Sequence, residues 1–315
     1  MFKRIDPLLC EFELNLHGAF FPAGFPLHLA SNSQAVMDAA GEAWGAWKRA
    51  FDTSPLELRV IVQPSGDVAV PPVYRKQGAL ISAVSDAYNF AAADAVRLTA
   101  NFWLSERTAA DCALMRWHYL DALVFMLLTQ QYVVSLHGAC VARNGRGILL
   151  CGHSGAGKST LSVAAARAGF TFVSDDCTWV RTDSNDLIAI GKPHQARLRH
   201  DAGRHFPELS GLTPRALPNA KLSIEPPTSM LENLRTASQV EVANVVFLDR
   251  MSGGEPRLET VAESEANRLL LADLPSYGAE VNATHERTVA RLAALSTWRL
   301  HYAELTDAIR LLSGL

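Results

Sequence analysis

Strict alternation of buried-type and polar side chains marks the first third of the chain as β-rich. Over residues 56–63, every second side chain is a Leu or Val, the period of a strand with one buried face. Shorter alternations over residues 80–103 predict further strands. A helix is expected over residues 33–51, where the spacing of Trp44 and Trp47 favours a core face over a binding platform. These patterns predict a small, mostly β N-terminal domain.

Apolar residues at helical spacing predict a helix over residues 108–130. Charged side chains within it, such as Asp111 and Arg116, favour a core helix over a membrane span. We place the domain boundary just before this helix. The result is an N-terminal α+β domain of residues 1–107 and a second domain of residues 108–315.

After this helix, the second domain continues with two β-rich runs, residues 132–141 and 147–151. Between them, Asn144-Gly145 is the strongest short signal for a β-hairpin. An antiparallel hairpin in this place is unusual for doubly wound folds, whose neighbouring strands are joined through helices. Later patterns predict strands over 170–174, 177–181, 187–190, 240–250 and 298–304, and helices over 263–274, 285–295 and 306–312. The fold class is therefore α/β with a mixed sheet.

Composition excludes several classes of function. The chain has 315 residues, of which 49% are hydrophobic and 19% charged, enough for a substantial core in two domains or one large one. A net charge of −3 gives no reason to expect a nucleic acid or an anionic membrane as partner. Five scattered cysteines without a C-x-x-C pair predict reduced thiols rather than disulfides. The first residues lack the features of a secretion signal, so a cytoplasmic location is expected.

A phosphate-binding loop is predicted where the apolar run 148–151 breaks into glycines. Gly152, four further residues and Gly157-Lys158-Ser159 match G-x-x-x-x-G-K-[ST]. Glycines let backbone N–H groups point at phosphate oxygens, the lysine adds a cation, and the serine hydroxyl suits Mg²⁺. A chance match in a Gly/Ser-rich turn is the alternative, which the preceding strand and following helix disfavour. The expected nucleotide-binding residues are Gly152, His153, Ser154, Gly155, Ala156, Gly157, Lys158, Ser159 and Thr160.

Two carboxylates end the strand after the loop helix. Asp175 and Asp176 stand where a metal ligand or catalytic base is needed, although a solvated Ser-Asp-Asp turn has the same pattern. Further on, Arg197 and Arg199 share a face if they lie on a strand, and both could then reach phosphate oxygens. A solvated basic edge is equally compatible. The nearby histidines have no zinc-binding spacing.

These stretches resemble the catalytic region of the HPr serine kinase/phosphorylase family. The likeness is carried by Leu136-His137-Gly138, by the loop of residues 152–159 and by Val173-Ser174-Asp175-Asp176. It covers residues 135–225 well and the remainder loosely. The resemblance implies a P-loop domain like that of HPr kinase, with a nucleotide site similar to phosphoenolpyruvate carboxykinase and with ATP and Mg²⁺ as cofactors. The N-terminal domain has no such match and is a candidate for acceptor choice.

The resemblance also implies roles for single residues. Asp175 would act as base toward the acceptor hydroxyl, with His137 beside it, although a hydrogen-bonded core histidine is the alternative. Ser159 and Asp176 would hold Mg²⁺, and Lys158 would neutralise charge on the transferred group. Arg199 would supply an additional cation, and Arg197 is a weaker candidate for the same role.

Departures from the family pattern show which members of the family the chain resembles less. Thr160 stands where the family has Glu, and His153 where it has an acidic residue. The stretch that marks the bifunctional enzymes is not identifiable between Thr213 and Glu232. The chain is closer in this respect to shortened HPr kinase-related proteins, some of which phosphorylate a serine on a ribosomal peptide.

Three hypotheses for function follow. The first is a kinase for a serine-type hydroxyl of a peptide or small protein, and the second a kinase for a small metabolite such as free serine, threonine or a sugar. The third is an inactive nucleotide-binding regulatory module. The presence of Asp175, Asp176 and His137 together favours catalysis. Hexamers and dimers among the relatives favour a homo-oligomer over a monomer.

Overall fold

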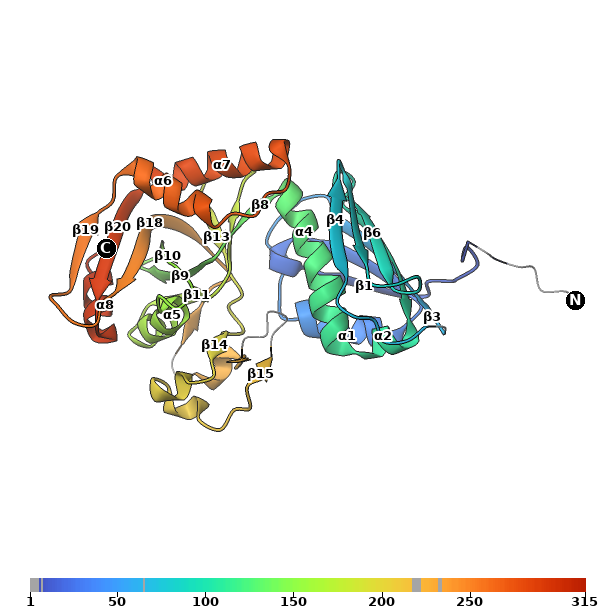
Figure 1. Ribbon diagram of the computed structural model, residues 1–315, viewed down its shortest axis with the longest axis horizontal. Helices are drawn as coiled ribbons and strands as arrows, with labels where there is room; N and C mark the ends of the chain where they lie inside the picture. Colours follow the sequence, from blue (N-terminus) through green and yellow to red (C-terminus); the bar gives the residue numbers. More distant parts are fainter. Residues whose placement is uncertain (1–5, 7, 65, 217–221, 232–233) are drawn as a thin grey trace, which may run out of the picture. The chain divides into compact units, whose positions relative to one another are not determined.

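The computed structural model divides the chain into two compact units, Met1–Gln131 and Tyr132–Leu315 (Figure 1). It describes residues 6, 8–64, 66–216, 222–231 and 234–315. Residues 1–5, which bear on the expected absence of a secretion signal, lie outside that set. The boundary expected at residue 107 is corrected to residue 131. The intervening helix belongs to the first unit because Trp44 Nε1 donates to Asp121 Oδ1 at 2.8 Å and Tyr74 Oη donates to the His118 carbonyl at 2.6 Å.

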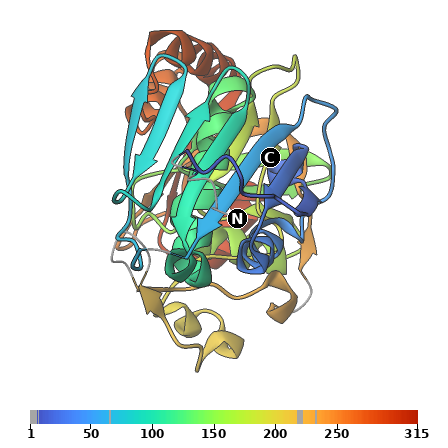
Figure 2. The same cartoon turned by 90° about the vertical axis from the view of Figure 1, so that its right-hand side faces the viewer.

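Within the described residues, the first unit contains a seven-stranded mixed sheet in the order β1-β2-β3-β7-β6-β5-β4 (Figure 2). Its strands are β1 Leu16–Phe20, β2 Leu27–Ser31, β3 Leu56–Gln63, β4 Val73–Gln77, β5 Leu80–Val84, β6 Phe90–Asp94 and β7 Thr99–Ser105. The alternation predicted over 56–63 is confirmed, since Leu56, Leu58, Val60 and Val62 are all buried. The unit is mostly β with added helices, as predicted.

Helices cover one face of this sheet. They are α1 Gln34–Trp44, α2 Glu106–Ala110, α3 Cys112–Leu114, a π-helical segment Met115–Asp121 and α4 Ala122–Gln131. The first helix ends at Trp44, with Gly45 as its C-cap, before the expected residue 51. Trp44 and Trp47 are both buried, which confirms that they are core residues.

The segment Cys112–Gln131 is the one helix in the described part of the chain that is long and apolar enough to cross a membrane. Half of its most apolar stretch is buried inside the protein. Leu120, Leu123 and Leu127 are fully buried. A buried core helix meets the same length and composition criteria, and this packing agrees with the core helix expected from the sequence.

The second unit is built on a sheet of ten described strands, with β17-β11-β9-β10-β18-β13-β12-β8 as its main path. Strand β20 pairs with β18, and β19 with β20. The bounds are β8 Val133–Leu136, β9 Gly138–Arg143, β10 Arg146–Cys151, β11 Thr171–Ser174, β12 Thr178–Arg181, β13 Ile188–Ile190, β17 Arg235–Thr236, β18 Gln239–Arg250, β19 Arg257–Thr260 and β20 Ser296–Tyr302. Antiparallel and parallel pairs occur together, so the predicted mixed sheet is confirmed.

The predicted hairpin before the loop is present as β9 and β10. Asn144 and Gly145 both have positive φ, 51° and 78°, as a two-residue hairpin turn of the favoured twist requires. The sheet therefore brings an antiparallel strand next to the strand that feeds the phosphate loop.

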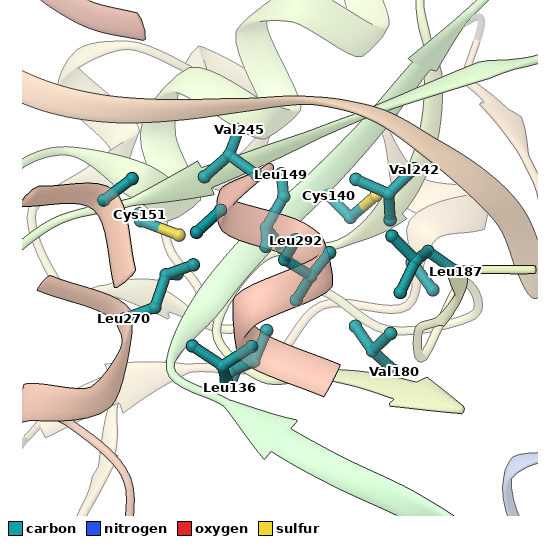
Figure 3. Close-up of a cluster of buried hydrophobic side chains, with 14 of the residues drawn as sticks. Leu136, Cys140, Leu149, Cys151, Val180, Leu187, Val242, Val245, Leu270 and Leu292 are labelled. Carbon is teal, nitrogen blue, oxygen red and sulfur yellow. The ribbon is translucent and has the colours of Figure 1, made fainter. Parts of the chain in front are cut away.

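Helices cover both faces of this sheet. Alternate residues of β10 point to opposite faces and pack against different pairs of helices. Leu149 and Cys151 join a cluster with α6 Glu263–Ala272 and α7 Ala279–Ala293, to which Leu270 and Leu292 belong (Figure 3). Ile148 and Leu150 face the other way, toward α5 Lys158–Arg167 and α8 Leu305–Leu312.

A third, small sheet packs against α5. It contains β14 Leu198–Arg199, β15 Arg215–Ala216 and β16 Leu222–Ile224 in the order β14-β16-β15. Leu198 and Ile224 pack in one cluster with Val163 of α5 and Phe172 of β11. Helix α5 is thereby covered on two sides, which fixes the direction of its first turn.

Candidate active site

One edge of the large sheet collects the groups that carry chemistry. Strands β11, β10, β18 and β20 all run in the same direction. Both β11 and β10 pair antiparallel with β9, β18 pairs in parallel with β10, and β20 pairs in parallel with β18. Their carboxyl ends lead to Asp175, to the loop after Cys151, to Arg250 and to Tyr302. His137 precedes β9 and reaches the same edge from the opposite direction, since Gly138 pairs with Cys151.

The loop between β10 and α5 has the backbone expected of a phosphate cradle. Gly155 and Gly157 have φ of 94° and 95°, values that L side chains rarely adopt. Tyr302 Oη donates to the Ala156 carbonyl at 2.9 Å. A Cβ on Gly157 would lie 2.7 Å from that hydroxyl oxygen. The loop therefore requires glycine at 157 for both its conformation and its space.

Lys158 opens helix α5 and lies almost fully buried across the loop. Its Nζ donates to the Gly152 carbonyl at 2.5 Å and to the His153 carbonyl at 3.3 Å. A buried ammonium needs such partners, because an unpaired charge away from water is costly. The cation is thus held over the loop at the amino end of α5, where anions are favoured.

Ser159 connects the loop helix to the acid pair. Its Oγ donates to the Asp175 backbone carbonyl at 3.1 Å. A hydroxyl has one hydrogen and two lone pairs, so this bond leaves the lone pairs available for a cation. The described residues contain no cluster of three or more His, Cys, Asp or Glu side chains that could hold a metal. A hydroxyl with one carboxylate still suits Mg²⁺, which keeps waters and takes phosphate oxygens as its remaining ligands.

Asp175 is buried at the end of β11, with 6% of its surface exposed. Its Oδ2 accepts a hydrogen bond from the Arg197 backbone N–H at 2.7 Å. Burial, and then the neighbouring charge of Asp176, raise the pKa of Asp175 to about 7, and the Arg197 contacts oppose the rise only in part. The carboxyl is therefore poised to exchange a proton near neutral pH.

Asp176 points into more polar surroundings than its neighbour. Its Oδ2 accepts from Arg197 Nη1 at 3.1 Å, and its Oδ1 lies 3.6 Å from His137 Nδ1. Arg197 also donates from Nε to Glu225 Oε1 at 2.8 Å. Arg197 is therefore already held by two carboxylates, so it positions the acid pair instead of being a spare cation.

A cavity of about 350 Å³ lies at this edge. Of the expected site residues it is lined by His137, Ser154, Gly155, residues 157–160, Asp176 and Arg199. Gly152, His153, Ala156 and Asp175 do not line it, and Asp175 lies one residue from the cavity wall. Arg199 Nη2 is 3.3 Å from the position of a Cβ on Gly155, so this guanidinium lies beside the loop.

The cavity also contains groups that the sequence analysis did not single out. They include Arg250 and Asp201. A signal for Arg250 existed, because a polar residue at the carboxyl end of an apolar parallel strand lies where α/β sheets bind ligands. Asp201 and His205 flank the 3-10 turn Ala202–Arg204, and His205 is one of the histidines whose spacing disfavoured a zinc site.

Comparison with known proteins supports the assignment for part of the chain. No family model matches. Curated HPr kinase/phosphorylases are similar: that of Lachnoclostridium phytofermentans is 35% identical over 79 residues, and that of Bacillus subtilis 34% over 78. That of Chlorobium limicola is 35% identical over 85 residues. These alignments cover 25% to 27% of this chain and 23% of each relative, so the chain spans about a quarter of their length.

Among solved structures, the Hpr(Ser) kinase/phosphatase from Coxiella burnetii aligns with 57% of this chain and 94% of its own. The identity is 14% and the TM-score 0.33, which is too low to support an assignment. The sequence relatives confirm the resemblance inferred from the loop and the acid pair. Over the segment that it shares with them, this chain is similar to HPr kinase/phosphorylases.

Proposed function

We propose that this protein is an ATP- and Mg²⁺-dependent kinase that phosphorylates a serine-type hydroxyl of a peptide or small protein. One observation carries the proposal: Lys158 and Ser159 of the loop and Asp176 of the acid pair line the same cavity. A phosphate bound to the loop would therefore lie beside the acid pair. A nucleotide-binding module without transfer activity would use Lys158, Ser159 and Asp176 as well, but it would not need the buried carboxyl of Asp175 with its raised pKa beside them.

The donor side of the reaction follows from the loop. Backbone N–H groups of the cradle and the buried ammonium of Lys158, which two loop carbonyls hold in place, would neutralise phosphate oxygens. Arg199, beside Gly155, adds a cation at the same place. Bound between Ser159 and Asp176, Mg²⁺ would neutralise charge that develops on the phosphate oxygens.

The acceptor side is assigned to Asp175. As the acceptor oxygen bonds to the γ-phosphorus, the bond to the leaving diphosphate breaks and the hydroxyl proton passes to a base. Asp175 has Oδ2 occupied by the Arg197 N–H, which leaves Oδ1 for this proton. Its pKa of about 7 suits a base at neutral pH. His137, near Asp176, is proposed to orient the acceptor.

A peptide or protein acceptor is proposed because the curated relatives are named as kinases of the protein HPr. The match covers only part of those relatives, and HPr itself is therefore one candidate among polypeptide acceptors.

The test is incubation of the purified chain with γ-labelled ATP, Mg²⁺ and either purified HPr or a cell extract, followed by identification of labelled species. We expect label on serine of a polypeptide. D175N should bind ADP like the wild type yet transfer phosphate at least about a hundredfold more slowly, the contribution typical of a general base. Label only on a small metabolite would overturn the acceptor class.

A variant of the second acid decides between the two carboxylates. If D176N lost transfer but still bound ADP in the presence of Mg²⁺ like the wild type, while D175N kept transfer, the base would be Asp176. Absence of nucleotide binding by the wild type would overturn the kinase proposal altogether.

A further inference from the structure

Arg250 occupies a defined place at the edge of the large sheet. It ends β18, the strand that pairs in parallel with β10, and it lines the same cavity as Lys158. In the register of β18 and β20 it stands opposite Tyr302, whose hydroxyl anchors the loop at Ala156. Backbone hydrogen bonds between β18 and β20 fix the main chain at Arg250 and Tyr302. The N–H of the next residue, Met251, donates to the Tyr302 carbonyl at 2.8 Å.

The guanidinium of Arg250 is not used by the fold in any described contact. Neither Arg250 nor Arg199 forms an ion pair or side-chain hydrogen bond with another described residue, whereas Arg197 is bound by Asp176 and Glu225. Asp249, the residue before Arg250, points to the opposite face of the sheet, because successive side chains of a strand alternate. Its Oδ2 lies 2.9 Å from His301 Nδ1. Arg250 therefore presents a guanidinium without an ion-pair partner among the described residues to a cavity lined by the cations Lys158 and Arg199 and by the carboxylates Asp176 and Asp201.

The order of strands places Arg250 on a particular flank of the loop. Asp175 and Asp176 follow β11, which lies two strands from β10 on one side. Arg250 ends β18, which lies one strand from β10, roughly 4.8 Å, on the opposite side. The acid pair and Arg250 thus face the loop from opposite flanks. If the γ-phosphate points toward the acid pair, the phosphates that stay with the nucleotide lie toward Arg250.

We propose that Arg250 binds the phosphates of the nucleoside diphosphate that leaves after transfer, on the flank of the loop opposite the acid pair. This inference rests on the kinase function proposed above and adds a residue to its donor site. The planar guanidinium can donate two parallel hydrogen bonds to phosphate oxygens, and a lysine at the same position would act only as a point charge. Arg250 is a binding residue in this assignment, since it takes no part in proton transfer.

Titration with ADP and with ATP, in the presence of Mg²⁺, tests the proposal. Wild type, R250A, R250K and R310A should be compared by calorimetry. Arg310 is the matched control, because it is an exposed arginine of α8 paired with Asp307 outside the cavity. We expect R250A to weaken ADP and ATP alike by at least about tenfold, the effect of losing one or both of these charge-assisted hydrogen bonds. R250K should fall between R250A and wild type, and R310A should match wild type.

Each outcome has a distinct meaning. Affinities of R250A within about twofold of wild type, in a variant with an unchanged melting temperature, would overturn the assignment of Arg250 alone. A loss confined to ATP would place Arg250 on the transferred phosphate and overturn the assignment to the leaving nucleotide. If R250A proves unstable, R250K and R250Q provide the same comparison. Failure of the wild type to bind either nucleotide would instead overturn the kinase proposal, and this inference with it.

Discussion

Tyr302 and Ala156 are joined by a hydrogen bond of 2.9 Å, from the phenol hydroxyl to the backbone carbonyl. Tyr302 ends β20 and is almost fully buried, and Ala156 lies at the centre of the phosphate loop. Burial raises the pKa of Tyr302 to about 12, so the hydroxyl keeps its proton and remains a donor at any physiological pH. The loop is therefore held to the sheet from outside its own strand and helix.

Replacing Tyr302 by Phe should loosen the loop. The Ala156 carbonyl would lose its donor, at a cost of about 1 kcal/mol in the free energy of unfolding, and ADP affinity should fall as the cradle becomes less ordered. Urea denaturation and ADP titration measure the two effects. Y74F is the matched control, because Tyr74 donates to the His118 carbonyl within the first unit. That variant should lose stability and keep its ADP affinity; an equal loss of affinity would contradict a local role for Tyr302.

Replacing Gly157 by Ala should abolish nucleotide binding. The new Cβ would meet Tyr302 Oη at 2.7 Å while the backbone stays at φ 95°. Gly169 separates the two causes, because its φ is 100° but a Cβ there would meet nothing within 4 Å. We expect G169A to cost about 1 kcal/mol of stability from backbone strain alone and to leave ADP affinity unchanged. Normal ADP binding by G157A would refute the described packing of the loop.

The stability of the second unit should depend on pH through Asp175. Its pKa is about 7 in the folded protein and 3.8 without the fold, so the folded state keeps a proton that the unfolded state has released. Between about pH 4 and 7 the free energy of unfolding should therefore fall as pH rises, by at most about 1.4 kcal/mol per pH unit. D175N should lack this decline.

Urea midpoints at about pH 5 and pH 7 measure the difference between wild type and D175N. D94N serves as a control with the opposite shift, since the backbone N–H of Arg97 lowers the pKa of Asp94 below 3.8. The titration of Asp94 is complete below this pH range. The urea midpoint of D94N should therefore change with pH in the same way as that of the wild type. A D175N curve that also runs parallel to that of the wild type would show that Asp175 is ionised in the folded protein.

Removal of the Ser159 hydroxyl should raise the Mg²⁺ concentration needed for half-maximal phosphate transfer, by roughly tenfold if one metal ligand is lost. S162A is a suitable comparison, because Ser162 is buried on the same helix and donates to the Ser159 carbonyl at 3.0 Å. The S162A requirement for Mg²⁺ should equal that of wild type. An unchanged requirement in S159A would remove Ser159 from the metal site.

The sequence alone predicted the elements whose evidence is local. Strand β3 matches its predicted range, and β18 differs by one residue, because alternating or continuous apolar runs specify strands directly. The Asn144-Gly145 turn was likewise encoded in two adjacent residues, and the glycines of the predicted phosphate loop have the positive φ values that glycine allows. Helix α7 begins at Ala279, before the expected 285, because its first turns are polar and carry little periodic signal.

What depended on distant residues was not predictable. The domain boundary is fixed by the bond between Trp44 and Asp121, which are far apart in sequence. Burial of Asp175 depends on the Arg197 backbone N–H, and nothing in the Asp-Asp dipeptide shows which carboxyl turns inward. Arg250 gains its place from strand order, which periodicity cannot supply.

The anchoring of the loop by the last strand has a consequence for biosynthesis. Because translation proceeds from the amino end, residues 152–160 emerge from the ribosome long before Tyr302 is added. Until then the nascent chain holds the complete loop sequence without the hydroxyl that fixes it, and without β20 to border β18. Maturation of the cradle is therefore a late event, completed only when the final strand docks.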